Sequence, residues 1–404
     1  MTLRGRLFVG AGALVVATGL VLGLHDLTKI GLLLVLLPGL AVLLARRELD
    51  LDITRVVHPT RVTTDAHADV TVRVRNDGRL PTPLLRGEEG LAYALGDRPH
   101  LLVPRLDGGE SRQLTYRVRS HVRGHHRIGP LTLRVDDPFG LATRGVTIPG
   151  EATLVVLPRV VPLSPVRGVA AGSGGETTTS PRIALHGEDD VAVREYRMGD
   201  DLRRIHWRST ARTGETMVRQ DEQPTRRRAL VLLDDRAAVH AGTGDGGSFE
   251  WSVTAVASVA TLLLRERFEV HLCLTSDTSG TVLPVQGIDH ALDELAAVQP
   301  HETTSPSGIV EALDEFAHHG GGLVVGVVGA LDDDVAAMCT GRSRHGIALV
   351  IDRGGFAHGQ DEGGPAGATA QQLALGGWRA HVVSPGASLP EVWARATVGM
   401  GAIR

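Results

Sequence analysis

Acidic residues directly follow two strands predicted in the C-terminal half of the chain, and they are the first candidates for chemistry. Asp234 and Asp235 come after the apolar run 229–233, and three aspartates, 332–334, follow the run 323–328. The carboxyl ends of parallel strands meet at one edge of a sheet, where folds of this class bind ligands. Carboxylate oxygens that converge there could hold a hard divalent cation such as Mg²⁺ or Mn²⁺.

A second candidate is the charged stretch between residues 191 and 222, which carries seven arginines and six acidic residues. The charges are balanced and interleaved with Tyr196, Ile205 and Trp207, which favours salt bridges on an apolar seam over a phosphate-binding patch. We expect this segment to dock against the α/β domain; the alternative is a solvated charged belt without a partner. The expected ion pairs join Arg194, Arg203 and Arg212 to Asp200, Asp201 and Glu215.

A hydrolase needs a nucleophile, a base and an orienting group, and His206 could serve as the base. Asp200, Asp201, Ser209 or Cys273 could complete such a set. However, the chain has no Gly-x-Ser-x-Gly elbow, no HExxH motif, no Walker loop and no GxGxxG directly after a strand. Its two cysteines lie in core-like contexts without zinc spacing. We therefore expect a protein that is not an enzyme and keep the hydrolase as an alternative.

The composition sets the general class of the protein. The chain of 404 residues is 42% hydrophobic and 22% charged, with a formal net charge of −4. This apolar fraction excludes a disordered or low-complexity protein. The balance of charge argues against a protein held to nucleic acid or to acidic lipid mainly by its overall charge. We expect two or three folded domains and no nucleic-acid partner.

Two uncharged apolar runs, 7–24 and 30–45, lie near the N-terminus and predict a pair of transmembrane helices within residues 1–49. A secretory signal peptide would not be followed at once by a second span and a basic stop. The basic residues flank the pair rather than separate it, apart from one lysine, so both ends are expected in the cytoplasm. We therefore expect a multi-pass protein of the cell membrane whose soluble body faces the cytoplasm. The flanking residues are Arg4, Arg6, Arg46 and Arg47, and the lysine is Lys29.

Residues 50–163 show the period-two alternation of half-buried strands, as at Val70, Val72 and Val74. Short alternating runs separated by turn residues are typical of an antiparallel β-sandwich. The Gly- and Thr-rich stretch 164–186 predicts a flexible linker.

The charged signature segment, 187–228, leads into a region of alternating strands and helices, 229–404. This alternation predicts a doubly wound α/β domain with a mainly parallel sheet. The expected strands are 229–233, 270–274, 323–328, 347–351 and 380–383, and the expected helices lie near 253–264, 309–317, 335–339 and 390–396.

The signature segment resembles the family called domain of unknown function 58. The β-region carries an earlier signature of the same family, and the paired N-terminal spans agree with it. The central motif is Arg194, Glu195, Tyr196, Gly199, Asp200, Asp201, Arg203, Ile205, His206, Trp207, Ala211 and Arg212, followed by Leu232, Leu233 and Asp234. The earlier signature is Arg123, Gly124, Gly129, Pro130 and 137–141.

The resemblance implies a membrane-anchored protein with a von Willebrand factor A-like C-terminal half. Members are commonly encoded beside MoxR-type AAA+ ATPases, often with a transglutaminase-like membrane protein. By analogy, the resemblance implies a noncatalytic, protein-binding adaptor of a MoxR-type ATPase in envelope assembly or protein maturation. The implied interaction residues are those of the central motif.

The alternative is a metal-dependent binding module of the von Willebrand factor A type. That family has Asp-x-Ser-x-Ser after its first strand, whereas this chain has Asp234 followed by Asp235, Arg236 and two alanines. No hydroxyl is available in this stretch, and Arg236 places a cation where a metal would compete. Thr303 or Thr304 could match the family's threonine and Asp332 its later carboxylate. We therefore expect no cofactor and keep a divalent cation as the alternative.

Overall fold

The computed structural model describes residues 1–46, 49–137, 139–165, 193–196, 205–219, 227–277, 282, 284–302, 305–343, 346–358 and 364–397. Contacts between residues group the chain into two units. The first comprises Met1–Val161, His240–Ser258 and Gln286–Glu302, and the second comprises Pro162–Val239, Val259–Val285 and Thr303–Arg404. Two segments of the region 229–404, residues 240–258 and 286–302, group with the β-region. One reason is that helix α5 (Ile288–Ala297) packs against two strands of that region.

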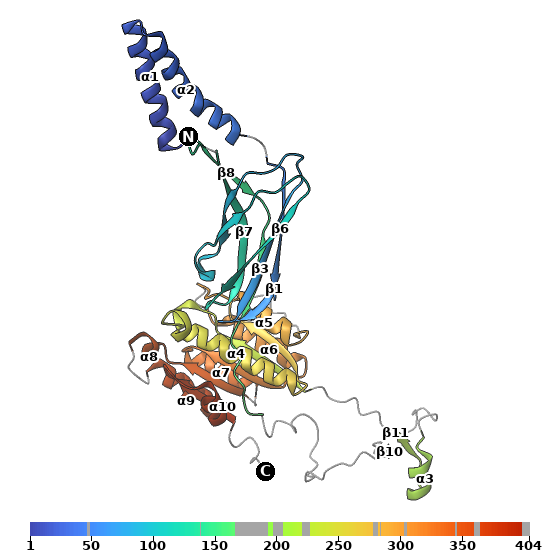
Figure 1. Ribbon diagram of the computed structural model, residues 1–404. Coiled ribbons are helices and arrows are strands. Elements are labelled where there is room, and N and C mark those ends of the chain that lie inside the picture. Colours follow the sequence, from blue (N-terminus) through green and yellow to red (C-terminus); the bar gives the residue numbers. More distant parts are fainter. Residues whose placement is uncertain are drawn as a thin grey trace. The chain divides into compact units, whose positions relative to one another are not determined.

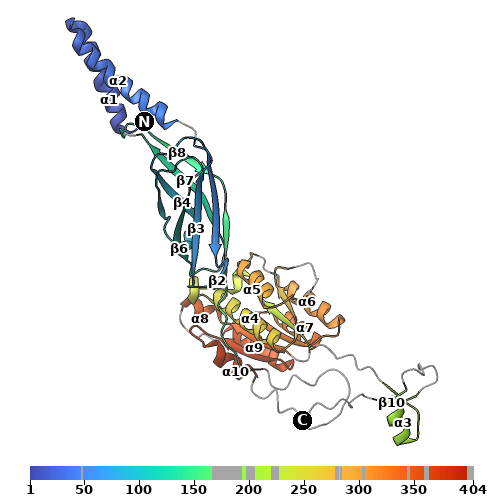
Figure 2. The same ribbon diagram turned by 45° about the vertical axis from the view of Figure 1, so that its right-hand side comes forward.

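Two helices, α1 (Leu3–Leu22) and α2 (His25–Ala45), lie side by side at the start of the first unit (Figures 1 and 2). Both are long and apolar enough to cross a membrane. Glycine permits their close approach, because a Cβ on Gly12 would lie 2.9 Å from the carbonyl oxygen of Gly31.

The turn of this hairpin is tighter than expected. Gly23 adopts a left-handed conformation with φ of 69° and ends α1, so a single further residue suffices to begin α2. The polar stretch 25–29, expected as the loop, forms the start of α2 instead. There Asp26 suits the positive helix end and pairs with Lys29.

The β-region contains two sheets that share one hydrophobic core. The first sheet has the order β1-β3-β6, and the second has the order β2-β9-β7-β4-β5 with β8 paired to β7. Its strands are β1 (Leu51–His58), β2 (Arg61–Thr63), β3 (His67–Asn76), β4 (Leu85–Leu91), β5 (His100–Val103), β6 (Ser111–Arg119), β7 (Gly124–Asp136), β8 (Thr143–Ile148) and β9 (Ala152–Leu157).

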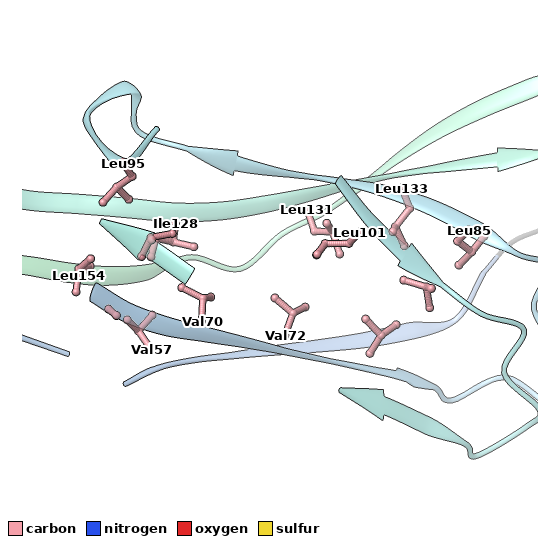
Figure 3. Close-up of a cluster of buried hydrophobic side chains, with 14 of the residues drawn as sticks. Val57, Val70, Val72, Leu85, Leu95, Leu101, Ile128, Leu131, Leu133 and Leu154 are labelled. Atoms are coloured by element: carbon pink, nitrogen blue, oxygen red, sulfur yellow. The ribbon is translucent and has the colours of Figure 1, made fainter. Parts of the chain in front are cut away.

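The core of the β-region follows the predicted alternation. Val70 and Val72 of β3 point into the same cluster as Leu131 and Leu133 of β7 (Figure 3), and all four are fully buried. The pairings within these sheets are antiparallel except that β2 runs parallel to β9. Two sheets burying one core agree with the expected sandwich.

The second unit contains a five-stranded parallel sheet with the order β13-β12-β14-β15-β16. Helices α9 and α10 pack against its β15 and β16 side (Figure 1). The strands are β12 (Arg228–Leu233), β13 (Glu269–Leu274), β14 (Leu323–Val328), β15 (Gly346–Ile351) and β16 (Arg379–Val383). The helices are α6 (Ser307–His318), α7 (Asp333–Arg342), α8 (Arg353–His358), α9 (Pro365–Leu375) and α10 (Leu389–Thr397), and α4 (Ser248–Arg265) contributes to both units.

These strands lie within a residue of their expected positions. Helices α5, α8 and α9 were not expected.

The order of the sheet matters for function, because the chain leaves β12 toward β13 and later returns to pair β14 on the other side of β12. The ends of β12 and β14 therefore flank the switch point, where open parallel sheets bind ligands.

A short strand β10 (Val193–Glu195), the helix α3 (Trp207–Thr213) and the strand β11 (Met217–Arg219) make up the described part of the signature segment. β10 and β11 pair antiparallel, and an isolated bridge joins Ile205 to Val218. Of the expected linker, 164–186, residues 166–186 lie outside the described residues.

A buried ion pair links the two sheets of the β-region. Arg55 of β1 donates from Nε to Glu89 of β4 at 2.7 Å, and both side chains are almost completely buried. Burial raises the pKa of the Glu89 carboxyl, and the hydrogen bond and charge of Arg55 oppose that rise. Gly129, from the expected signature, lies against Arg55 with a φ of 107°. A side chain there would meet the guanidinium.

Breaking this pair should destabilise the β-region strongly. Arg55→Met leaves the Glu89 carboxylate buried without its cation, which costs about 3–5 kcal/mol. The double variant Arg55→Met/Glu89→Leu removes both charges and should recover most of that loss. Hydrogen exchange of peptides from β1 and β4 in the full-length protein measures both effects. A double variant no more protected than the single variant would contradict the ion-pair account.

Candidate functional site

The switch point of the parallel sheet is occupied by an ion pair made from the chain itself. Asp234 follows β12, is fully buried, and accepts two hydrogen bonds from Arg236, from Nε at 2.8 Å and from Nη2 at 2.7 Å. The backbone N–H of Gly329, just after β14, donates to the same carboxylate at 3.0 Å. The two strand ends that flank the switch point are therefore joined through Asp234.

Electrostatics favour the charged form of the arginine in this pair. Burial lowers the pKa of Arg236, but the hydrogen bond to Asp234 and the charges of Asp234, Asp332 and Asp235 outweigh it, so the pKa is raised. The guanidinium also reaches the carbonyl oxygen of Ala330 at 3.4 Å. A permanent cation thus lies against the carboxylate that a metal would need.

The other acidic residues at this edge bind backbone groups or face solvent. Asp235 accepts from the backbone N–H of Ser276 at 2.9 Å and from its hydroxyl, which ties the end of β13 to the end of β12. Asp332 is the N-cap residue of α7 and is exposed. Asp352, directly after β15, is buried and accepts from Gly355 N–H at 3.1 Å.

The sequence analysis did not single out Asp352, although the rule that found Asp234 applies to it: an acidic residue comes directly after an apolar strand. Of the metal candidates, Thr303 lies outside the described residues, as does Thr304. Among the described residues, no group of three His, Cys, Asp or Glu side chains could hold a metal ion. At this edge of the sheet the cation is the Arg236 guanidinium, which makes a bidentate contact with Asp234.

Neither cysteine is an activated nucleophile. Burial, with smaller contributions from Asp277, Asp235 and Glu311, raises the pKa of the Cys273 thiol to about 12. Burial likewise raises the pKa of Cys339 to about 11. The thiolate is the reactive form, so both groups are almost entirely unreactive thiols at neutral pH.

The described part of the signature segment is a small unit built on β10, β11 and α3. The backbone N–H of Tyr196 donates to Thr216 O at 2.8 Å, and that of His206 donates to Met217 O at 2.8 Å. Val218 is buried, whereas Arg212 and Glu215 are exposed. Arg212 and Glu215 form no ion pair within the described part of the chain. The side chain of Arg194 and residues Gly199, Asp200, Asp201 and Arg203 lie outside the described residues, so the expected clamps stay predictions.

His206 caps the helix that follows it. Its Nδ1 accepts the backbone N–H of Ser209 at 3.3 Å and lies 2.8 Å from the Ser209 hydroxyl, so the imidazole acts as the side-chain N-cap of α3. This bonding assigns the ring proton to Nε2. The structure thus brings together two residues of the alternative hydrolase set. No carboxylate among the described residues bonds to the ring.

Trp207, the first residue of α3, projects into solvent with 71% of its surface exposed. Two of the other three tryptophans, Trp378 and Trp393, are buried. Arg208 and Arg212, on the same short helix, are also exposed. The signature segment therefore presents an apolar ring beside cationic side chains.

Arg123, from the earlier signature, fixes helices onto the β-region within the first unit. Its buried guanidinium forms an ion pair with Glu250 of α4 and donates to the carbonyl oxygens of Leu295 and Val298 at the end of α5. The guanidinium also lies 5.1 Å from the ring centroid of Phe249. Arg123 thus explains why these two helical segments group with the β-region.

The 137–141 signature forms a loop that contacts the base of the helical hairpin. Asp137 shapes it by accepting the backbone N–H groups of Phe139, at 2.8 Å, and Ala142. The Thr2 hydroxyl donates to Gly140 O at 2.8 Å, and the buried Leu141 packs with Ala41 and Ala45 of α2. Sequence reasoning recognised this motif but did not assign it this structural role.

Comparison with known proteins identifies a family and one curated relative. Residues 192–353 match the family model described as "Protein of unknown function DUF58". The uncharacterized protein YeaD of Bacillus subtilis (strain 168) is 26% identical over 221 residues, with 52% of each chain covered. The chain therefore spans about half the length of this relative. The matched region includes residues 192–228 of the signature segment and the Asp234–Arg236 pair.

Two similar solved structures each cover 27% of the chain. The CARDB domain of a Pyrococcus furiosus protein is 20% identical, with a TM-score of 0.21, over 27% of this chain and 93% of that one. The putative ApaA protein of Bordetella pertussis is 18% identical, with a TM-score of 0.20, over 27% and 94%. TM-scores this low support no conclusion about fold or function.

The Asp234–Arg236 pair should stabilise the second unit. Arg236→Ala leaves a buried carboxylate without its cation, at a cost of about 3–5 kcal/mol. Arg342→Ala is the control, because the Arg342–Asp314 pair is partly exposed and worth less than about 1 kcal/mol. Thermal unfolding followed by fluorescence of the buried tryptophans measures both. Equal losses in the two variants would contradict the proposed importance of the buried pair.

The capping function of His206 is also testable. His206→Asn should retain the cap, whereas His206→Ala should lose about 1 kcal/mol of local helix stability, or about fivefold in exchange protection. Hydrogen exchange of the 205–219 peptide is the measurement. Loss of protection in both variants would show that the imidazole does more than cap α3.

Proposed function

This chain belongs to the protein family of unknown function DUF58, and we propose that it is a noncatalytic, membrane-anchored adaptor that binds another protein through its signature segment. The proposed partner is a MoxR-type AAA+ ATPase, with a transglutaminase-like membrane protein as a further member of the assembly. The proposed process is envelope assembly or protein maturation. The partner is inferred from the family resemblance.

The observation that carries this proposal is the exposure of Trp207 at the start of α3. Tryptophan and arginine are enriched among residues that dominate binding energy at protein interfaces. Here a 71% exposed indole lies on the same helix as Arg208 and Arg212. The backbone N–H groups of Tyr196 and His206 donate to the carbonyl oxygens of Thr216 and Met217. These bonds fix the backbone beside the indole, which lowers the entropy cost of binding.

The filled switch point supports a function without a bound cation. We assign the α/β region to a von Willebrand factor A-like fold in which Arg236 replaces the metal. The alternation of strands and helices and the parallel sheet agree with this assignment. With Asp234 already bound to Arg236, such a domain would engage its partner through surface shape and ion pairs.

The helical hairpin supports membrane attachment. We infer that α1 and α2 span the membrane with both ends in the cytoplasm. Arg4, Arg6 and Arg46 lie at the ends of the hairpin, whereas Lys29, near its turn, is paired with Asp26 at 3.0 Å. This asymmetry follows the positive-inside rule.

A hydrolase is the second candidate, favoured by the 2.8 Å contact between His206 and the Ser209 hydroxyl. Ester or peptide turnover abolished by Ser209→Ala but unchanged by Thr213→Ala would support it. The nearby Thr213 hydroxyl bonds to the Ser209 carbonyl and is a matched control.

The adaptor proposal predicts that Trp207→Ala weakens ATPase binding by about 2 kcal/mol or more, or about thirtyfold in Kd. The assay uses the full-length protein in lipid nanodiscs and the purified MoxR-type ATPase of the same genome. The control is Tyr93→Ala, which removes a fully exposed aromatic ring from the β-region. An unchanged Kd for Trp207→Ala, or no complex with the wild type, would contradict the proposal.

A further inference from the structure

A pocket of about 640 Å³ lies where the end of α2 meets strand β8 in the first unit. Its lining combines apolar and polar side chains. Val42, Ala45 and Ala142 provide apolar surface, whereas Arg46, Thr143 and Arg144 provide hydrogen-bond donors. This combination suits a ligand with an anionic group joined to an apolar part.

A hydrogen bond joins the two arginines of this pocket, Arg46 and Arg144. Arg144 Nη1 donates to the carbonyl oxygen of Arg46 at 2.7 Å, so the guanidinium caps the carboxyl end of α2. Arg144 has further donor groups beyond that one. Within the described part of the chain, no carboxylate forms an ion pair with Arg46 or Arg144. Both cations are therefore available for an external anion.

The wall of the pocket is fixed by the loop that Asp137 shapes. Ala45 and Ala142 are buried in one small apolar cluster, and Asp137 accepts the backbone N–H of Ala142. The Thr2 backbone N–H donates to Leu141 O at 2.9 Å, which ties the start of α1 to the same loop. Binding a ligand here needs little further ordering, which favours affinity.

We propose that this pocket binds the headgroup of an anionic phospholipid. The phosphate accepts hydrogen bonds from the Arg46 and Arg144 guanidinium groups and the Thr143 hydroxyl, and the glycerol and upper acyl chains lie against Val42 and Ala45. Arginine forks match phosphate oxygens in geometry and charge. Basic pockets beside transmembrane helices are a known mode of lipid headgroup recognition.

The position of the pocket favours a lipid over a free phosphate. α1 begins and α2 ends at the same end of the hairpin, so in a membrane-spanning hairpin this level coincides with the headgroups. The inference thus rests on the proposed membrane attachment. A phosphate ion would leave the apolar wall unused.

Native mass spectrometry of the full-length protein in detergent, with added phosphatidylglycerol or phosphatidylcholine, tests the pocket. We expect the wild type to retain phosphatidylglycerol preferentially. Arg46→Gln and Arg144→Gln should each weaken that binding by about fivefold. The Arg46 side chain makes no hydrogen bond within the described part of the chain, so Arg46→Gln tests the site even if Arg144→Gln perturbs α2. The control is Arg119→Gln, an exposed arginine at the end of β6 remote from the hairpin.

Equal retention of the two lipids by the wild type, or unchanged phosphatidylglycerol binding in both pocket variants, would overturn the assignment. Displacement of phosphatidylglycerol by an equal concentration of inorganic phosphate would also overturn it, in favour of a free-phosphate site. Flotation with phosphatidylcholine vesicles tests membrane attachment separately. A protein that floats but shows no lipid preference contradicts the pocket alone, and one that keeps its preference without floating contradicts the anchor alone.

Discussion

The buried contact between Asp234 and Arg236 is the interaction that joins the ends of β12 and β14 in the α/β region. It fills the position where an open parallel sheet would bind a ligand, and the Gly329 N–H joins the same carboxylate. Because a guanidinium cannot lose its proton in a protein, the cation there is permanent. The proposed binding of another protein is accordingly assigned to a surface outside this edge, the exposed indole of Trp207 in the signature segment.

Buried arginine pairs recur in both units. Arg55 joins the two sheets of the β-region through Glu89, and Arg123 joins that region to α4 and α5 through Glu250 and two carbonyl oxygens. The chain has a single lysine, so almost all of its positive charge is carried by guanidinium groups. The planar fork of arginine can satisfy several acceptors at once, which suits it to these buried junctions.

The sequence predicted the elements whose signal is local. Apolar runs located the parallel strands, and alternation located β3 and β7, because burial directly sets these patterns. Helices α8 and α9 were missed because they are rich in glycine and alanine, but α5 was detectable, since Ala291, Leu292 and Leu295 are buried at helical spacing. The Arg55–Glu89 pair could not be predicted, because its partners lie in different sheets. Arg236, in contrast, was recognisable as a competing cation from its position beside Asp234.

The most direct test of the filled switch point is a calorimetric titration of the full-length wild-type protein with Mg²⁺ and with Mn²⁺. The account predicts no saturable binding, because Arg236 already satisfies Asp234. Saturable binding of either ion that disappears in Asp234→Ala would contradict it. Such a result would identify the α/β region as a metal-dependent binding module.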